Sequence, residues 1–159
     1  MAEAGFVRVD ERLLHGQVLV AWAAALRPRR IVLASEEVAA DASQRAIFES
    51  LPTDDYEIAV TTIAEAAAAL RAGERVLVVV ASPADALRLV ECGAGIGAIN
   101  LGGLRGAGKR RLTNAIFLGV EDLPALRALL ERGIALEARE LPGSRGLVVD
   151  AATLDRLES

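Results

Sequence analysis

Two patterns of hydrophobic residues alternate along the chain, and one of them, a short apolar run, predicts strands. Short runs rich in Val, Ile and Leu have the length and composition of strands that are buried in a sheet. These runs cover residues 6–9, 30–34, 56–60, 75–80, 98–101, 115–118 and 134–138. Because the runs are nearly continuous in apolar residues, they favour a sheet covered on both faces.

The second pattern predicts helices between most of these runs. Segments rich in Ala, Leu, Arg and Glu have amphipathic character and cover residues 17–26, 41–51, 63–71, 84–92 and 123–132. Gly73 and Gly133 follow two of these segments, where a helix end commonly requires a positive φ. Strands and helices in this order predict an α/β fold, an open, doubly wound, mostly parallel sheet with helices on both faces.

The composition is that of one globular domain, which we expect to span residues 1–159. Hydrophobic residues make up 53% of the chain, and no Ser/Gly linker or internal repeat divides it. After Leu141 the pattern is broken by Pro142, Gly143 and Gly146, and a short helix is expected at 151–157.

Several functional classes are disfavoured by the same composition. The formal net charge of −4 argues against a nucleic-acid partner. One histidine and one cysteine are too few for a transition-metal site, so we expect no metal and no cofactor. The apolar stretch 18–26 is much shorter than the roughly 20 residues that span a bilayer, so direct membrane insertion is not expected.

The only histidine, His15, lies in the loop between the first expected strand and the first expected helix. Open parallel sheets bind ligands beyond the carboxyl ends of their strands, so this loop is a candidate site. A neutral imidazole is a good phosphoryl acceptor because one ring nitrogen keeps a free lone pair. The position and the neighbours of His15 are also compatible with a role as a general base.

The neighbours of His15 suit a phosphoryl group. Arg12 could offer a bidentate donor fork, and Asp10 could hold the second ring nitrogen. Gly16 allows close approach of the backbone, whose N–H groups at a helix N-terminus favour anions. For Arg8, a phosphate contact and a structural ion pair remain equally open.

Several runs, taken in order, resemble a known family. They are 7–18 (VRVDERLLHGQV) followed by Trp22, 31–41 (IVLASEEVAAD), 73–76 (GERV), 82–85 (SPAD), 100–103 (NLGG) and 133–139 (GIALEAR). Together they closely resemble the IIB components of the mannose/fructose/sorbose family of the bacterial sugar phosphotransferase system. The resemblance covers nearly the whole chain.

The resemblance implies a phosphoryl carrier with a mostly parallel sheet and an antiparallel strand near one edge. His15 would accept a phosphoryl group from a phosphohistidine on a IIA partner and donate it to a sugar carried by IIC and IID membrane subunits. Arg12 and Asp10 belong to the catalytic loop. The expected phosphate contacts are Arg8, Gly16, Gln17 and Ser82. Such a protein is cytoplasmic and peripherally associated with the permease complex.

Some alternatives remain beside this interpretation. A regulatory module phosphorylated at His15 without sugar transport has the same sequence pattern. For Ser82, a plain helix N-cap is slightly favoured over a phosphate contact. The run 103–109 nearly matches a nucleotide P-loop, but Arg110 stands where Ser or Thr is needed. We interpret this segment as a solvated basic loop, and a further hypothesis is that Arg105, Lys109, Arg110 and Arg111 dock an acidic patch of the IIA partner.

Overall fold

The main sheet has seven strands in the order β3-β2-β4-β1-β5-β8-β9. The computed structural model describes residues 5–13, 16–51, 53, 55–105 and 108–159. The strands of this sheet are β1 (Phe6–Val9), β2 (Arg30–Ala34), β3 (Glu57–Thr61), β4 (Val76–Val80), β5 (Ala98–Leu101), β8 (Ala135–Ala138) and β9 (Leu147–Val149). Every pairing is parallel except β8 with β9. A separate antiparallel hairpin joins β6 (Arg110–Arg111) to β7 (Phe117–Leu118).

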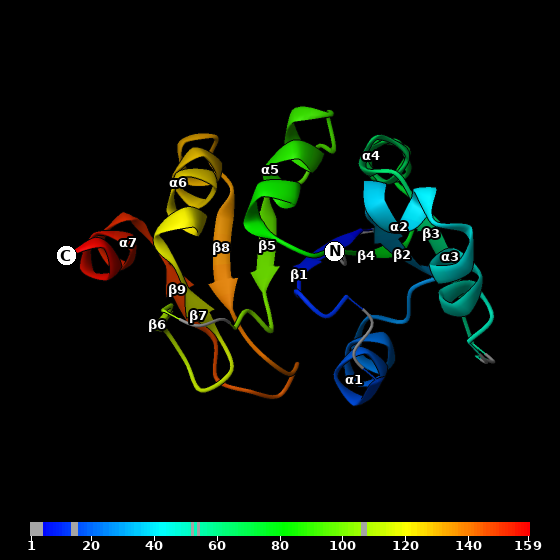
Figure 1. Cartoon of the computed structure of the whole chain (residues 1–159), viewed down its shortest axis with the longest axis horizontal. Helices are drawn as coiled ribbons and strands as arrows, with labels where there is room; N and C mark the ends of the chain where they lie inside the picture. Colours follow the sequence, from blue (N-terminus) through cyan, green and yellow to red (C-terminus); the bar gives the residue numbers. More distant parts are fainter. Residues whose placement is uncertain (1–4, 14–15, 52, 54, 106–107) are drawn as a thin grey trace.

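The helices cover both faces of the sheet. They are α1 (Gly16–Leu26), α2 (Glu36–Ala40), α3 (Ala42–Glu49), α4 (Ile63–Arg71), α5 (Pro83–Glu91), α6 (Leu123–Glu131) and α7 (Ala151–Glu158), with a 3-10 turn at Val120–Asp122. Figure 1 shows α4, α5 and α6 on one side of the strands and α1 on the other.

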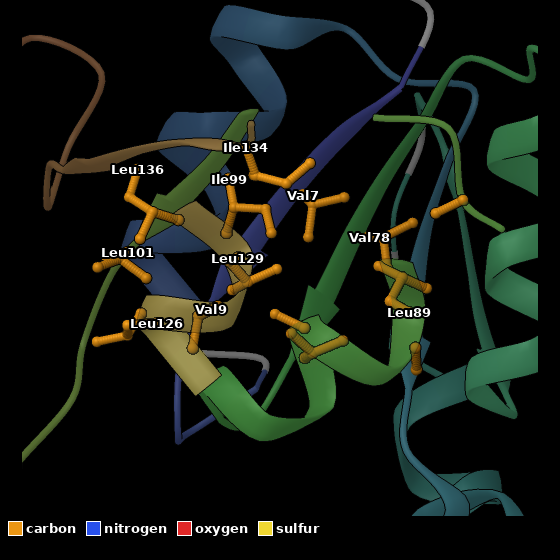
Figure 2. Close-up of a cluster of buried hydrophobic side chains, with 14 of the residues drawn as sticks. Val7, Val9, Val78, Leu89, Ile99, Leu101, Leu126, Leu129, Ile134 and Leu136 are labelled. Carbon is orange, nitrogen blue, oxygen red and sulfur yellow. The ribbon is translucent and has the colours of Figure 1, made fainter. Parts of the chain in front are cut away.

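Two hydrophobic cores follow from the alternation of side chains along the central strands. In β4, Val78 faces the cluster that contains Leu89 of α5, whereas Leu77 faces the cluster that contains Trp22 of α1. Figure 2 shows the first cluster between the sheet and helices α5 and α6. Because both faces are covered, β4 is buried along its whole length.

The predicted fold class is confirmed, including the antiparallel strand at one edge. The expected strand at 115–118 is shorter than predicted, because Leu112 and Thr113 both donate their N–H groups to Ile116 O in a tight turn, and Ile116 forms only an isolated bridge with Leu104. Only Phe117–Leu118 remains as a strand. β9 was not expected, since three residues are too short to reveal a period.

The near P-loop is not followed by the helix that nucleotide binding requires. Strand β6 begins at Arg110 instead. The segment therefore lacks the strand–loop–helix context of a phosphate-binding loop.

Candidate functional site

The loop after β1 is anchored at the carboxyl edge of the sheet, between β4 and β5. The N–H of Asp10 donates to Val80 O at 2.8 Å, and the N–H of Glu11 donates to Gly103 O at 2.9 Å. His15, the predicted phosphoryl acceptor, lies outside the described residues. The described part of the loop, up to Leu13, and the start of α1 at Gly16 lie on either side of it in the sequence.

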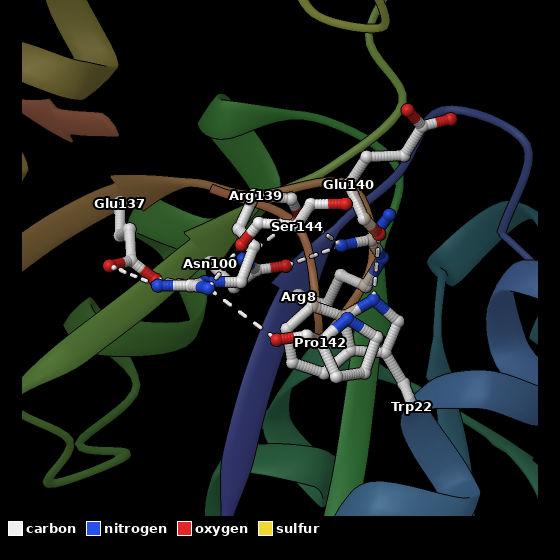
Figure 3. A network of polar contacts seen from close by, with 8 residues as sticks. All are labelled: Arg8, Trp22, Asn100, Glu137, Arg139, Glu140, Pro142 and Ser144. Carbon is white, nitrogen blue, oxygen red and sulfur yellow. Dashed lines mark hydrogen bonds and ion pairs between the residues drawn. The ribbon is translucent and has the colours of Figure 1, made fainter. Parts of the chain in front are cut away.

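Arg8 is almost entirely buried, with 1% of its surface exposed. Its Nη1 donates to Asn100 Oδ1 at 2.5 Å and to the carbonyl of Arg139 at 3.0 Å. The guanidinium carbon lies 5.3 Å from the centroid of the Trp22 ring, which is a cation–π distance. Figure 3 shows these contacts around the Arg8 side chain. Of the two roles left open for Arg8, burial and contacts favour the structural ion pair.

The position of Arg8 in β1 directs its side chain toward the face of the sheet that Trp22 covers. Arg8 shares its face with Phe6, two residues earlier, and Phe6 stacks on Trp22 with ring centroids 5.1 Å apart. Burial lowers the pKa of Arg8, and the nearby Asp10 carboxylate opposes this shift. A cation at this depth therefore depends on its carboxylate neighbour.

Asp10 lies between two arginines. Its Oδ2 is 3.4 Å from Arg8 Nη2, and its Oδ1 is 3.7 Å from Arg12 Nε. The carboxylate is buried, whereas about a third of the Arg12 side chain (36%) is exposed. The described contacts of the Asp10 carboxylate thus go to Arg8 and Arg12, and of these three residues Arg12 is the one that reaches the surface.

A turn with strained backbone ends the described part of this loop. The N–H of Leu13 donates to Asp10 O at 2.9 Å, and Leu13 has a φ of 55°. A non-glycine residue in the left-handed region costs roughly 1–2 kcal/mol. Such strain is found preferentially at functional sites.

Two consecutive glycines after β5 make room for the arginines. A Cβ built on Gly102 would overlap the guanidinium of Arg8. A Cβ on Gly103 would lie 2.9 Å from Arg12 Nη2 and 3.1 Å from Asp10 Oδ1. Any side chain at either position would have to displace the charged groups.

The segment after β8 closes the network from the other side. Asn100 Nδ2 donates to Arg139 O at 3.3 Å, and Trp22 Nε1 donates to Glu140 O at 2.8 Å. The Arg139 side chain binds both carboxylate oxygens of Glu137, at 2.9 and 3.2 Å. The hydrogen bonds from Arg139 lower the pKa of Glu137.

Sequence reasoning did not place Asn100, Arg139 or Glu140 in the site. Asn100 gave a usable signal, since it is a buried polar residue in an apolar strand and requires hydrogen-bond partners. Arg139 and Glu140 act here through backbone carbonyls, which no side-chain pattern reveals.

The other predicted phosphate contacts lie at two helix N-termini on this edge. Gly16 is exposed and begins α1, Gln17 follows it, and the first turn of α1 contains no acidic residue. Ser82 is the N-cap of α5, where its Oγ accepts the N–H of Asp85 at 3.1 Å. The hydroxyl hydrogen of Ser82 can still be donated, because this contact uses an oxygen lone pair.

Neither a metal site nor a membrane span emerges from the described ranges. Within residues 5–13, 16–51, 53, 55–105 and 108–159, no three His, Cys, Asp or Glu side chains are grouped to hold a metal ion. In the same part of the chain, no helix has the length and apolar character needed to cross a bilayer.

Comparison with known proteins gives one consistent family. The model of the phosphotransferase system (PTS) sorbose subfamily IIB component matches residues 4–153. The sorbose-specific EIIB component of Klebsiella pneumoniae is 30% identical over 137 residues, which cover 83% of this chain and 84% of that protein. The crystal structure of the IIBSor domain of the sorbose permease from the same species has a TM-score of 0.81 at 27% identity, covering 96% of this chain and 94% of the other.

A longer relative shows the same similarity over part of its length. The PTS mannose-specific EIIAB component of Escherichia coli K12 is 34% identical over 142 residues. The match covers 86% of this chain but 44% of that protein, so the chain spans less than half of this relative.

Proposed function

The chain belongs to the sorbose subfamily of PTS IIB components, and from this premise we propose that His15 carries a phosphoryl group from a IIA protein to a sugar. The sugar enters through IIC and IID membrane subunits. In this role the chain works in the cytoplasm, at the surface of the permease complex. The acceptor and donor steps both use the loop between β1 and α1.

The observation that carries the proposal is the pairing of Asp10 with Arg12 directly before His15. Asp10 contacts both the backbone N–H of Arg12, at 3.0 Å, and its guanidinium. This double contact orients a planar donor fork that matches phosphoryl oxygens in a bidentate manner. The N-terminus of α1 follows immediately and offers backbone N–H groups to an anion.

The transfer steps balance without a cofactor. A lone pair on one His15 nitrogen attacks phosphorus while the N–P bond of the donor phosphohistidine breaks. His15 releases the proton of its other nitrogen, and the donor imidazole takes one up. In the second step a sugar hydroxyl attacks phosphorus, the N–P bond to His15 breaks, and the hydroxyl proton passes to the imidazole. Arg12 and the α1 N-terminus stabilise the charge on the transferring group in both steps.

The test is incubation with a phosphorylated IIA domain, followed by mass spectrometry. The wild-type chain should gain the mass of one acid-labile phosphoryl group, and His15→Ala should gain none. A wild-type chain that takes up no phosphoryl group, or a His15→Ala chain that gains as much, contradicts the proposal.

The second step needs its own readout. Membranes that contain IIC and IID, together with a sugar, should remove the phosphoryl group and yield sugar phosphate. A phosphoryl group that stays on the protein under these conditions would instead support the regulatory alternative.

A further inference from the structure

A basic groove of about 400 Å³ lies between the β6–β7 hairpin, β9 and α7. Three exposed arginines line it, Arg110, Arg111 and Arg156, together with leucines that include Leu147 and Leu157. Figure 1 shows the hairpin beside β9, with α7 next to them. No Asp or Glu is among the described residues that line this groove.

The groove lies toward the same edge of the sheet as the candidate site. Leu147 pairs with Ala138, the last residue of the parallel strand β8. Because parallel strands end at a common edge, this pairing places Leu147 on the carboxyl side, where the loop after β1 also lies. A protein that reaches that loop can therefore contact the groove in the same complex.

Two acidic side chains of α7 are paired with an arginine that does not line the groove. On α7, Asp155 and Glu158 both pair with Arg127 of α6, at 2.9 and 2.8 Å. Arg156, between them in the sequence, donates to Thr153 Oγ1 at 3.4 Å. Neither Arg156 nor Arg110 forms an ion pair with any described residue, although the chain has a net charge of −4.

Lys109 does not belong to this surface, which corrects part of the sequence interpretation. Its Nζ lies 3.2 Å from Asp122 and 3.8 Å from Glu121, and only 15% of its side chain is exposed. These carboxylates neutralise Lys109. The cations that remain available beside the hairpin are arginines, and one of them, Arg156, comes from a distant helix.

We propose that this groove docks an acidic surface of the phosphorylated IIA donor, an inference that rests on the proposed function. Arginine forks suit carboxylates, and the leucines offer apolar contact in the same groove. A permease subunit is a poorer match, because cytoplasmic loops of membrane proteins carry an excess of Lys and Arg. A soluble donor also benefits from charge steering of the encounter.

The test compares two double charge reversals with equal change in net charge. Arg110→Glu/Arg156→Glu alters the groove. Arg27→Glu/Arg29→Glu is the control, since both residues are exposed and precede β2 at the opposite edge of the sheet. Phosphoryl uptake is measured from phosphorylated IIA at low and high salt, and from phosphoramidate as a small donor.

The groove variant should lose about 10-fold or more in kcat/KM with the protein donor at low salt, mainly through KM. The loss should shrink at high salt, and uptake from phosphoramidate should stay unchanged. The milder Arg110→Gln/Arg156→Gln should show a smaller loss of the same kind, which separates docking from misfolding.

Each failure has a different meaning. If wild-type protein accepts phosphoryl from neither donor, the proposed function fails. If wild type accepts it and the groove variant is as fast as the control at low salt, the docking proposal fails alone. A loss confined to transfer from His15 to sugar would assign the groove to the permease and overturn the proposal as well.

Discussion

Asp10 holds Arg12 at two points, with Oδ1 accepting the Arg12 backbone N–H at 3.0 Å and lying 3.7 Å from its side-chain Nε. The same carboxylate lies against the buried Arg8. One acidic side chain therefore connects the interior of the sheet to an arginine at the surface.

The first prediction concerns Arg12 in phosphoryl uptake. Arg12→Gln should lower the uptake rate from phosphorylated IIA by about 10²-fold, the effect of removing one preorganised donor. Arg12→Lys should retain more activity because it keeps the charge but lacks the planar fork. Rates are measured by rapid quench. Arg45→Gln, which removes an exposed ion pair with Glu49, is the control and should remain near wild type. Equal rates for Arg12→Gln and the control would contradict the role.

The second prediction concerns the buried ion pair. Asp10→Asn should lower the free energy of unfolding by about 3–5 kcal/mol, because it leaves the Arg8 cation buried without a counter-charge. Arg8→Met should destabilise the Asp10→Asn protein less than it destabilises the wild-type protein, and the difference in unfolding free energy should be about 1 kcal/mol or more. Urea unfolding of the four proteins measures the coupling. The exposed Asp55→Asn is the control, and additive effects of the two changes would show that the pair is not coupled.

A third prediction concerns the glycine beside Arg8. Gly102→Ala should destabilise the fold by about 1–3 kcal/mol, because its methyl group would overlap the Arg8 guanidinium. Gly143→Ala is the matched control, since a Cβ there meets no atom within 4 Å. Thermal unfolding of both variants gives the comparison. A Gly102→Ala protein as stable as Gly143→Ala would mean that the arginine moves aside at no cost.

The fourth prediction is a pH dependence at the start of α7. Hydrogen bonds from the N–H and hydroxyl of Thr153 lower the pKa of Asp150. Since the folded state binds this proton less readily, Asp150 contributes stability above its unfolded pKa of about 3.9. That contribution is lost as pH falls through the lower folded pKa.

Asp150→Asn isolates this effect, because asparagine caps a helix almost as well but does not titrate. The difference in unfolding free energy between wild type and variant should be constant above about pH 5 and should change toward lower pH, in the range where a carboxyl titrates. Urea unfolding between pH 3 and 7 measures it. A difference that does not vary with pH would show that Asp150 titrates alike in both states.

Most of the fold was predictable because the central strands of the sheet are buried and consist of nearly continuous apolar residues. β1, β2 and β5 begin and end at the predicted residues. α2 was not predicted, since its five residues span little more than one helical turn and cannot show a repeated pattern; Ser35 and Asp41 cap it on either side. Short elements depend on such caps and on neighbours rather than on periodicity.

Only those residues of the candidate site that are close to one another in the sequence could be predicted. Arg8, Asp10 and Arg12 are neighbours in the sequence, so their grouping was visible. Their partners Asn100, in β5, and Arg139, directly after β8, lie far along the chain, and which strands come together is set by the strand order of the sheet. The burial of Arg8 likewise follows from Trp22 and the segment after β8, which a local pattern does not report.

The contact between Arg8 and the carbonyl of Arg139 joins residues 131 positions apart. During synthesis, Arg8 leaves the ribosome long before this acceptor exists. The guanidinium can therefore be fully buried with all of these partners only after β8 and the residues that follow it have emerged. The loop after β1 is made before these partners, and it should be one of the last parts of the fold to reach its final packing.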